Sequence, residues 1–133
     1  MRQTVLVALS LTLSAAVPAA AAPVDSGWPT LAAVTDGECA LEITGNGKIF
    51  RIAATGLGDN VPGRYQISNG DMMPIDWSIR TSEEGRVARY YMPFRWGHAG
   101  ERIAGGTVEV RITTPACALR ATFPWQREIR VID

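Results

Sequence analysis

The sequence predicts an all-β protein, an antiparallel β-sandwich of about seven to eight strands closed by one disulfide. Three observations support this prediction. Short segments of residues 39–132 alternate between apolar and polar side chains, which is the period of a strand with one buried face. Turn-forming residues separate these segments roughly every ten positions. The chain after residue 22 shows no helical period of apolar residues.

Residues 1–22 have the three parts of an export signal. Arg2 supplies a positive start, residues 5–13 are mostly apolar, and alanines end the segment. The apolar part is shorter than the roughly 20 residues that a membrane-spanning helix needs. We therefore expect cleavage near Ala21 or Ala22 and a periplasmic or secreted protein with no transmembrane anchor.

The expected domain organisation has three parts: a signal peptide over 1–22, an extended lead-in over 23–38 and one sandwich domain over 39–133. The lead-in carries Pro, Gly and Asp at short intervals, with a short edge strand expected at 30–34. A chain of 133 residues is long enough for one domain with a single core.

The first clear alternation covers residues 39–44, with Cys39 on the apolar face. Asn46 and Gly47 follow and favour a hairpin, because both residues accept a positive φ at low cost. The returning strand is expected over 48–54.

Further strands are expected along the rest of the chain, separated by turns and loops. Residues 56–63 are expected to form a loop, and residues 82–85 to close a hairpin. Ile75, Trp77 and Ile79 share one face of an alternating segment, so we expect Trp77 in the core. The remaining expected strands are 64–68, 74–81, 86–92, 107–113, 117–123 and 128–132.

The two cysteines, Cys39 and Cys117, are 78 positions apart. In an oxidising compartment such an isolated pair is most simply one disulfide. Closing so long a loop would stabilise the fold by roughly 4 kcal/mol. Both cysteines lie on inward faces, which places the expected bond in the core. The whole pattern resembles an immunoglobulin-like or fibronectin-type sandwich over most of residues 30–133, and the resemblance implies two antiparallel sheets packed face to face.

The composition argues against several classes of function. With 13 basic and 13 acidic residues the chain has no basic excess, so nucleic acid is not an expected partner. A single histidine, His98, and two cysteines in a disulfide do not supply a blue-copper site. No GxSxG sequence is present for a serine hydrolase. We expect no metal, no cofactor and no catalytic residue.

Aromatic and arginine side chains are concentrated in residues 89–102, RYYMPFRWGHAGER. This mixture is typical of binding surfaces, because rings stack and arginine forms bidentate hydrogen bonds. The adjacent Tyr90 and Tyr91 cannot both face the core. Alternatively, the rings at 94 and 96 fold back to cap an open end of the sandwich. The candidate ligand-binding residues are Arg89, Tyr90, Phe94, Arg95, Trp96 and Arg102.

The sequence therefore favours an exported, non-catalytic binding or accessory protein whose partner is an envelope protein or a glycan. Two alternatives stay open. One is a carbohydrate- or small-ligand-binding domain that uses residues 89–102. The other is a small secreted hydrolase with a pair of carboxylates that the sequence does not identify. An unpaired edge strand would also permit β-augmentation by a partner.

Overall fold

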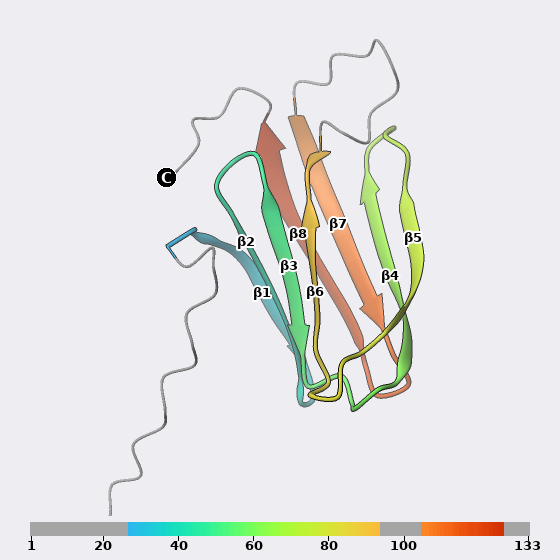
Figure 1. Cartoon of the computed structure of the whole chain (residues 1–133). Helices are drawn as coiled ribbons and strands as arrows, with labels where there is room; N and C mark the ends of the chain where they lie inside the picture. The colour runs from blue at the N-terminus through green and yellow to red at the C-terminus, as the bar shows by residue number, and fades with distance from the viewer. Residues whose placement is uncertain (1–26, 94–104, 127–133) are drawn as a thin grey trace, which may run out of the picture.

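The computed structural model describes residues 27–93 and 105–126, which form two four-stranded antiparallel sheets (Figure 1). Sheet A has the strand order β1-β2-β3-β6, and sheet B has the order β5-β4-β7-β8. The predicted all-β architecture with two antiparallel sheets is therefore confirmed. The strands are β1 (Thr30–Asp36), β2 (Cys39–Gly45), β3 (Phe50–Thr55), β4 (Pro62–Asn69), β5 (Ile75–Arg80), β6 (Val87–Tyr91), β7 (Gly105–Thr113) and β8 (Ala118–Gln126).

The stretch predicted as a lead-in contains the first strand of the sandwich. β1 is two residues longer than the short edge strand expected there, and it pairs with β2 at the edge of sheet A. Its half-buried Ala32 and Val34 pack against the core. Sheet A thus includes residues N-terminal to position 39. The predicted signal peptide over 1–22 and the predicted strand over 128–132 lie outside the described residues.

The turn predicted at Asn46 and Gly47 joins β2 to β3. Asn46 Oδ1 accepts hydrogen bonds from the backbone N–H groups of Lys48, at 3.0 Å, and Ile49, at 2.9 Å. Such a side-chain acceptor satisfies turn donors that the sheet ladder does not reach. The loop is four residues long, since Gly45 and Phe50 are the pair that closes the hairpin.

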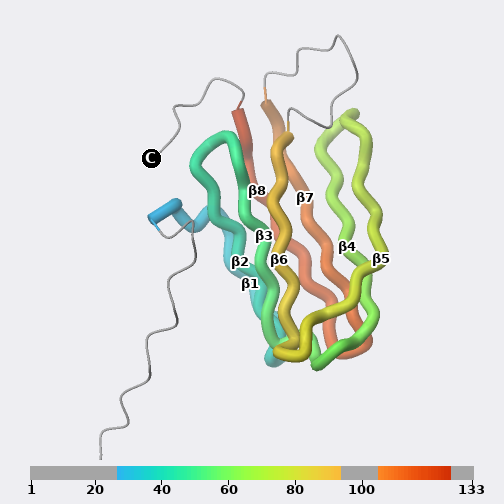
Figure 2. Tube along the Cα trace, in the orientation of Figure 1, coloured from blue at the N-terminus to red at the C-terminus, as the bar shows by residue number. Residues whose placement is uncertain are grey.

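Residues 82–85 turn the chain but do not close a hairpin, so that expectation was wrong. β5 pairs with β4 in sheet B, whereas β6 pairs with β3 in sheet A. The chain crosses from one sheet to the other between them (Figure 2). The turn itself is held by backbone hydrogen bonds from Gly85 to Ser82 and from Ser82 to Arg86, both at 3.0 Å. Turn-forming residues reverse the chain without specifying which sheet the next strand joins.

The strand order differs from that of an immunoglobulin constant-type domain. Such a domain has its first, second, fifth and fourth strands in one sheet and the third, sixth and seventh in the other. Here sheet A holds the first, second, third and sixth strands. Both arrangements have two antiparallel sheets packed face to face, but the strands are distributed differently between the two sheets.

The core lies between the sheets and is built from alternate residues of the strands. Phe50 of β3 and Phe123 of β8 meet across it, with ring centroids 4.6 Å apart. The predicted disulfide is confirmed: Cys39 begins β2 and Cys117 immediately precedes β8, with their Cα atoms 6.5 Å apart. Because both cysteines are buried, the bond joins the two sheets from inside the core.

A buried polar cluster crosses the core where β4, β6 and β8 end. Asn69 is only 4% exposed, and its Nδ2 donates to Tyr91 Oη at 3.2 Å and to Met72 Sδ at 3.1 Å. Its Oδ1 accepts a hydrogen bond from Trp125 Nε1 at 2.9 Å. Trp125 is itself buried and caps the core. One side chain of sheet B thus fixes an aromatic residue from each sheet.

Candidate functional site

Two of the six sequence-predicted binding residues, Arg89 and Tyr90, lie in the described part of the chain. They are neighbours on β6, so they point to opposite faces of sheet A. Tyr90 is 54% exposed on the outer face, across from Arg51, while Tyr91 is buried. This confirms that only one of the two adjacent tyrosines faces the core. The other four predicted residues, Phe94, Arg95, Trp96 and Arg102, lie outside the described residues, as does His98.

Arg89 lies on the inner face of sheet A but is exposed. It is in phase with Val87 and Tyr91, which are both buried against sheet B. β6 is the outermost strand of sheet A, so Arg89 projects at the lateral edge of the sandwich. One of its Nη atoms donates to the carbonyl of Ala88 at 2.8 Å. Within residues 27–93 and 105–126, no carboxylate forms an ion pair with it.

Trp77 is not in the core, contrary to the sequence prediction. It is in phase with the buried Ile75 and Ile79, yet 42% of its surface is exposed. The reason is that β5 is the outermost strand of sheet B, so its middle residue lies at the open lateral edge. The indole ring stacks on Tyr65 of β4, with ring centroids 5.7 Å apart and an interplanar angle of 22°.

Tyr65 is the buried member of this group, with 1% exposure. Burial raises the pKa of its phenol, and the positive charge of Arg89 partly opposes that rise. The guanidinium of Arg89 is therefore close enough to act electrostatically on the Tyr65 hydroxyl. No described residue forms a hydrogen bond with that hydroxyl. We call Tyr65, Trp77 and Arg89 the edge cluster.

Sequence reasoning identified Arg89 but missed the other two members of the edge cluster. Tyr65 and Trp77 both occupy inward positions of alternating strands, which normally indicates core. An alternating pattern shows which side chains of a strand point inward. It does not show that β5 and β6 are edge strands of the two sheets, where an inward side chain can stay exposed.

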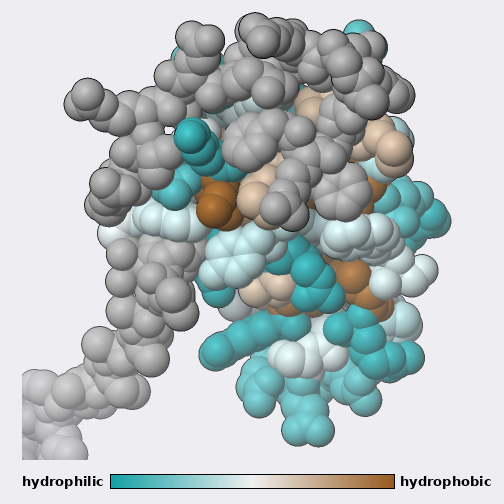
Figure 3. Space-filling model, turned by 45° about the horizontal axis from the view of Figure 1, so that its top comes forward, coloured by the Kyte–Doolittle hydropathy of each residue, from teal (hydrophilic) through white to brown (hydrophobic). Residues whose placement is uncertain are grey.

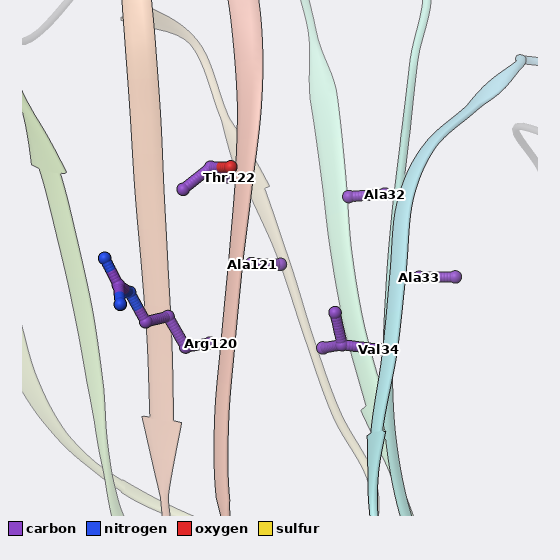
Figure 4. A pocket seen from close by; sticks show the side chains of 6 residues that line it. All are labelled: Ala32, Ala33, Val34, Arg120, Ala121 and Thr122. Carbon is purple, nitrogen blue, oxygen red and sulfur yellow. The ribbon is translucent and has the colours of Figure 1, made fainter.

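The opposite lateral edge has a different character. There β1 and β8 flank a groove (Figure 4), and Ala118 N–H donates to Asp36 Oδ2 at 2.9 Å at one end of it. The side chains of Arg120 and Thr122 point away from β1 in Figure 4. Small residues and backbone therefore form most of the groove. Its lining residues are Ala32, Ala33, Val34, Arg120, Ala121 and Thr122.

Two carboxylates, Asp76 and Glu109, line a shallow depression on the outer face of sheet B. Arg64 donates to both oxygens of Asp76, at 2.7 and 3.0 Å, and this lowers the pKa of that carboxyl. Hydrogen bonds from Arg120, at 2.7 Å, and Arg111, at 2.6 Å, lower the pKa of Glu109. A glycosidase needs one acid with a raised pKa as proton donor. Neither of these groups has that property.

The exposed apolar side chains of the described residues are dispersed. Figure 3 shows brown atoms in small areas bordered by teal and pale ones. Leu31 lies on β1, Met73 between β4 and β5, Trp77 on β5 and Tyr90 on the outer face of β6. The described residues include no group of three or more His, Cys, Asp or Glu placed to hold a metal ion. They also include no helix with the length and hydropathy needed to cross a membrane.

Comparison with known proteins does not assign a family. No protein-family model matches the chain, and no curated protein or solved structure matches it. The function must therefore be argued from the residues of the site.

Proposed function

We propose that this chain is an exported, non-catalytic binding protein that contacts a component of the cell envelope through the edge cluster. The observation that carries the proposal is Trp77, which is 42% exposed at an inward position of β5, while Arg89 is exposed on β6, an edge strand of the other sheet. Tryptophan and arginine are among the residue types most enriched at the energetic centres of interfaces. Trp77 keeps 42% of its surface exposed, although burial of that surface would stabilise the protein.

Two further observations support export. Residues 1–22 have the composition of a signal peptide. The disulfide between Cys39 and Cys117 is compatible with a periplasmic or secreted protein, because such bonds persist in oxidising compartments. Fold analogy adds nothing to the argument, since sandwiches host many unrelated functions.

We propose that the protein is not an enzyme because two carboxyl groups that could act as catalytic acids have a lowered pKa. Among the described residues, Asp76 and Glu109 share a depression, and hydrogen bonds from arginines lower the pKa of both carboxyl groups. An ionised acid in an ion pair serves neither as a proton donor nor as a free nucleophile without first breaking that pair. The hydrolase alternative is therefore less well supported than the binding alternative.

The experiment is a co-sedimentation assay with isolated cell envelopes, using protein purified after expression of the full chain. Trp77→Ala and Arg89→Ala should each weaken binding by about tenfold, which corresponds to about 1.4 kcal/mol. Tyr90→Ala is the matched control, because Tyr90 is exposed on the same strand but on the opposite face. Circular dichroism checks that each variant is folded. If both folded edge variants bind like the wild type, the edge cluster is not the site.

A further inference from the structure

β1 differs from the other edge strands of the described residues in its lack of protection. An edge strand exposes N–H and C=O groups with which a further strand can pair, and proteins commonly protect such edges with charged residues or proline. The three other edge strands carry this protection: Asp76 and Arg80 on β5, Arg89 on β6, and Arg120 and Pro124 on β8. β1 has no charged residue and no proline before Asp36, its last residue.

Asp36 itself is engaged elsewhere. Its Oδ2 accepts a hydrogen bond from the N–H of Ala118, at 2.9 Å, where β8 begins. The carboxylate is thus directed toward sheet B. At the other end of β1 the pairing register with β2 shifts between Thr30 and Ala32. The regular and unprotected part of this edge therefore runs from Ala32 to Asp36.

The turn between β1 and β2 determines which backbone groups of β1 point outward. The loop of residues 37–38 joins the paired Asp36 and Cys39, and its first residue, a glycine, has a φ of +59°. In a two-residue hairpin loop of this kind, the flanking residues form a hydrogen-bonded pair. The far end of the hairpin agrees, because Gly45 N–H donates to the Pro29 carbonyl at 3.2 Å, an even number of residues from Cys39.

Hydrogen-bonded and non-hydrogen-bonded pairs alternate along two antiparallel strands. Ala32 and Val34 therefore bond to β2, whereas the N–H and C=O groups of Ala33 and Thr35 point to the other side of β1. In the part of the chain that the structure describes, no strand pairs with that side. β1 thus offers a short ladder of donors and acceptors beside the groove between β1 and β8.

The side chains along this edge are small and mostly apolar. In Figure 4 Ala32 and Val34 point from β1 toward β8, while Ala33 points the other way. Ala32 and Val34 pack against the core but are only half buried, and Ala121 of β8 also lines the groove. A strand added alongside β1 would cover these side chains and remove apolar surface from water.

We infer that β1 is a dimerisation edge, which pairs antiparallel with β1 of a second copy so that the two A sheets form one continuous sheet. The two-fold axis passes at Val34, and Ala33 of each copy lies opposite Thr35 of the other. The outward N–H and C=O groups of one copy then meet those of its partner.

A second copy suits this edge because the pairing of identical antiparallel strands is self-complementary about a two-fold axis. In this register Asp36 lies opposite Ala32 of the second copy, so the two carboxylates are at opposite ends of the paired segment and do not repel each other. The inference goes beyond the proposed function, since β1 lies at the lateral edge opposite the edge cluster. A dimer would present two edge clusters.

The test uses purified protein from expression of the full chain. The paired segment is short compared with a standard interface of about 800 Å² per partner, so the dimer should be weak. Sedimentation velocity over roughly 1 μM to 1 mM should show the wild type pass from monomer to dimer. Over the same range, amide hydrogen exchange at Ala33 and Thr35 should slow, whereas exchange at Val34, whose N–H is already bonded to β2, should change little.

Two charge variants test the register at Ala33 and Thr35, which are both exposed on the outer face of sheet A. Ala33→Lys/Thr35→Lys places like charges opposite each other twice and should raise the Kd at least about fivefold. Ala33→Lys/Thr35→Glu places opposite charges together and should bind about tenfold more tightly than the double-lysine variant. This difference should shrink at high salt.

The matched control is Ser78→Lys/Ala88→Lys. It adds the same two positive charges at exposed positions of β5 and β6, on the other lateral edge, and should change the Kd by no more than about twofold. Circular dichroism checks that each variant is folded.

Three results overturn the inference. A wild type that stays monomeric over the whole range has no dimerisation edge, whether β1 is open or covered by another segment. Equal dimerisation of the wild type and the double-lysine variant means that the copies meet through another face. Equal weakening in both charge variants means that the register is wrong. The exchange measurement needs no variant, so unchanged exchange at Ala33 and Thr35 contradicts the inference even if a variant does not fold.

Discussion

Replacement of Asn69 by alanine is the sharpest test of how the end of the sandwich is held together. Asn69 bonds to a tyrosine from sheet A and to a tryptophan from its own sheet, and all three residues are buried. The substitution removes every hydrogen bond of the amide at once. It leaves Tyr91 Oη and Trp125 Nε1 in the core without that partner.

The expected loss of unfolding free energy follows from Tyr91 Oη and Trp125 Nε1. A buried polar group that loses its partner destabilises the fold by about 1–3 kcal/mol, so the two groups together destabilise it by roughly 2–6 kcal/mol. We expect a loss near 4 kcal/mol, against a total stability of about 5–15 kcal/mol for a domain of this kind. For a domain of about 100 residues this corresponds to a fall in Tm of roughly 15–30 °C.

The assay is urea unfolding under non-reducing conditions, combined with a double-mutant cycle. Tyr91→Phe removes one hydroxyl and should cost about 1 kcal/mol. The Asn69→Ala/Tyr91→Phe double variant should cost about 1 kcal/mol less than the sum of the single variants, because the tyrosine hydroxyl is no longer stranded. A loss below about 1 kcal/mol for Asn69→Ala, or strict additivity in the cycle, would refute the reasoning.

Three further predictions concern the disulfide, the two ion pairs of Glu109 and one glycine with a positive φ. Cys39→Ser should lower the free energy of unfolding by about 4–5 kcal/mol, since the bond closes a loop of 78 positions; a change below about 1 kcal/mol in urea unfolding would contradict this. Two arginines lower the pKa of Glu109, so its contribution to stability is complete above about pH 4.5 and is lost as the pH falls through the lower folded-state pKa. Glu109→Gln should therefore lose less stability than the wild type on acidification, and parallel pH profiles would count against a stabilising role of the two ion pairs. Gly56→Ala should cost about 2–3 kcal/mol, because a Cβ there would lie 2.1 Å from the carbonyl oxygen of Glu38 at a φ of +71°. Gly70→Ala, with a positive φ but open space around it, should cost only about 1 kcal/mol and is the control for thermal denaturation.

Much of the fold was predictable because its strands are half buried. Where one face of a strand meets the core, apolar and polar residues must alternate, so the segments show directly in the sequence. Residue 124 illustrates a limit of this reasoning. The predicted strand stopped at Phe123, yet β8 continues through Pro124 to Gln126. β8 is an edge strand of sheet B, and an edge strand tolerates a residue without an N–H donor.

The candidate site was less predictable because it depends on which strands are outermost. Trp77 and Ile79 have the same phase on β5, but the tryptophan is exposed and the isoleucine is buried. β5 is an edge strand because the chain crosses to sheet A after it, and alternation does not show which inward side chains of an edge strand stay exposed. That crossing follows from long-range packing, and residues 82–85 carry no local signal of it.

The position of the disulfide has a consequence for the order of folding. Cys39 is at the start of the second strand, and its partner immediately precedes the last described one. β1 also borders a groove whose other wall is β8. β1, β2 and β3 can pair with one another early, but Cys39 has no partner until Cys117, 78 positions later, has been made. Because the chain has only two cysteines, no wrong intramolecular bond is available while it waits. A wrong disulfide can therefore form only with another molecule.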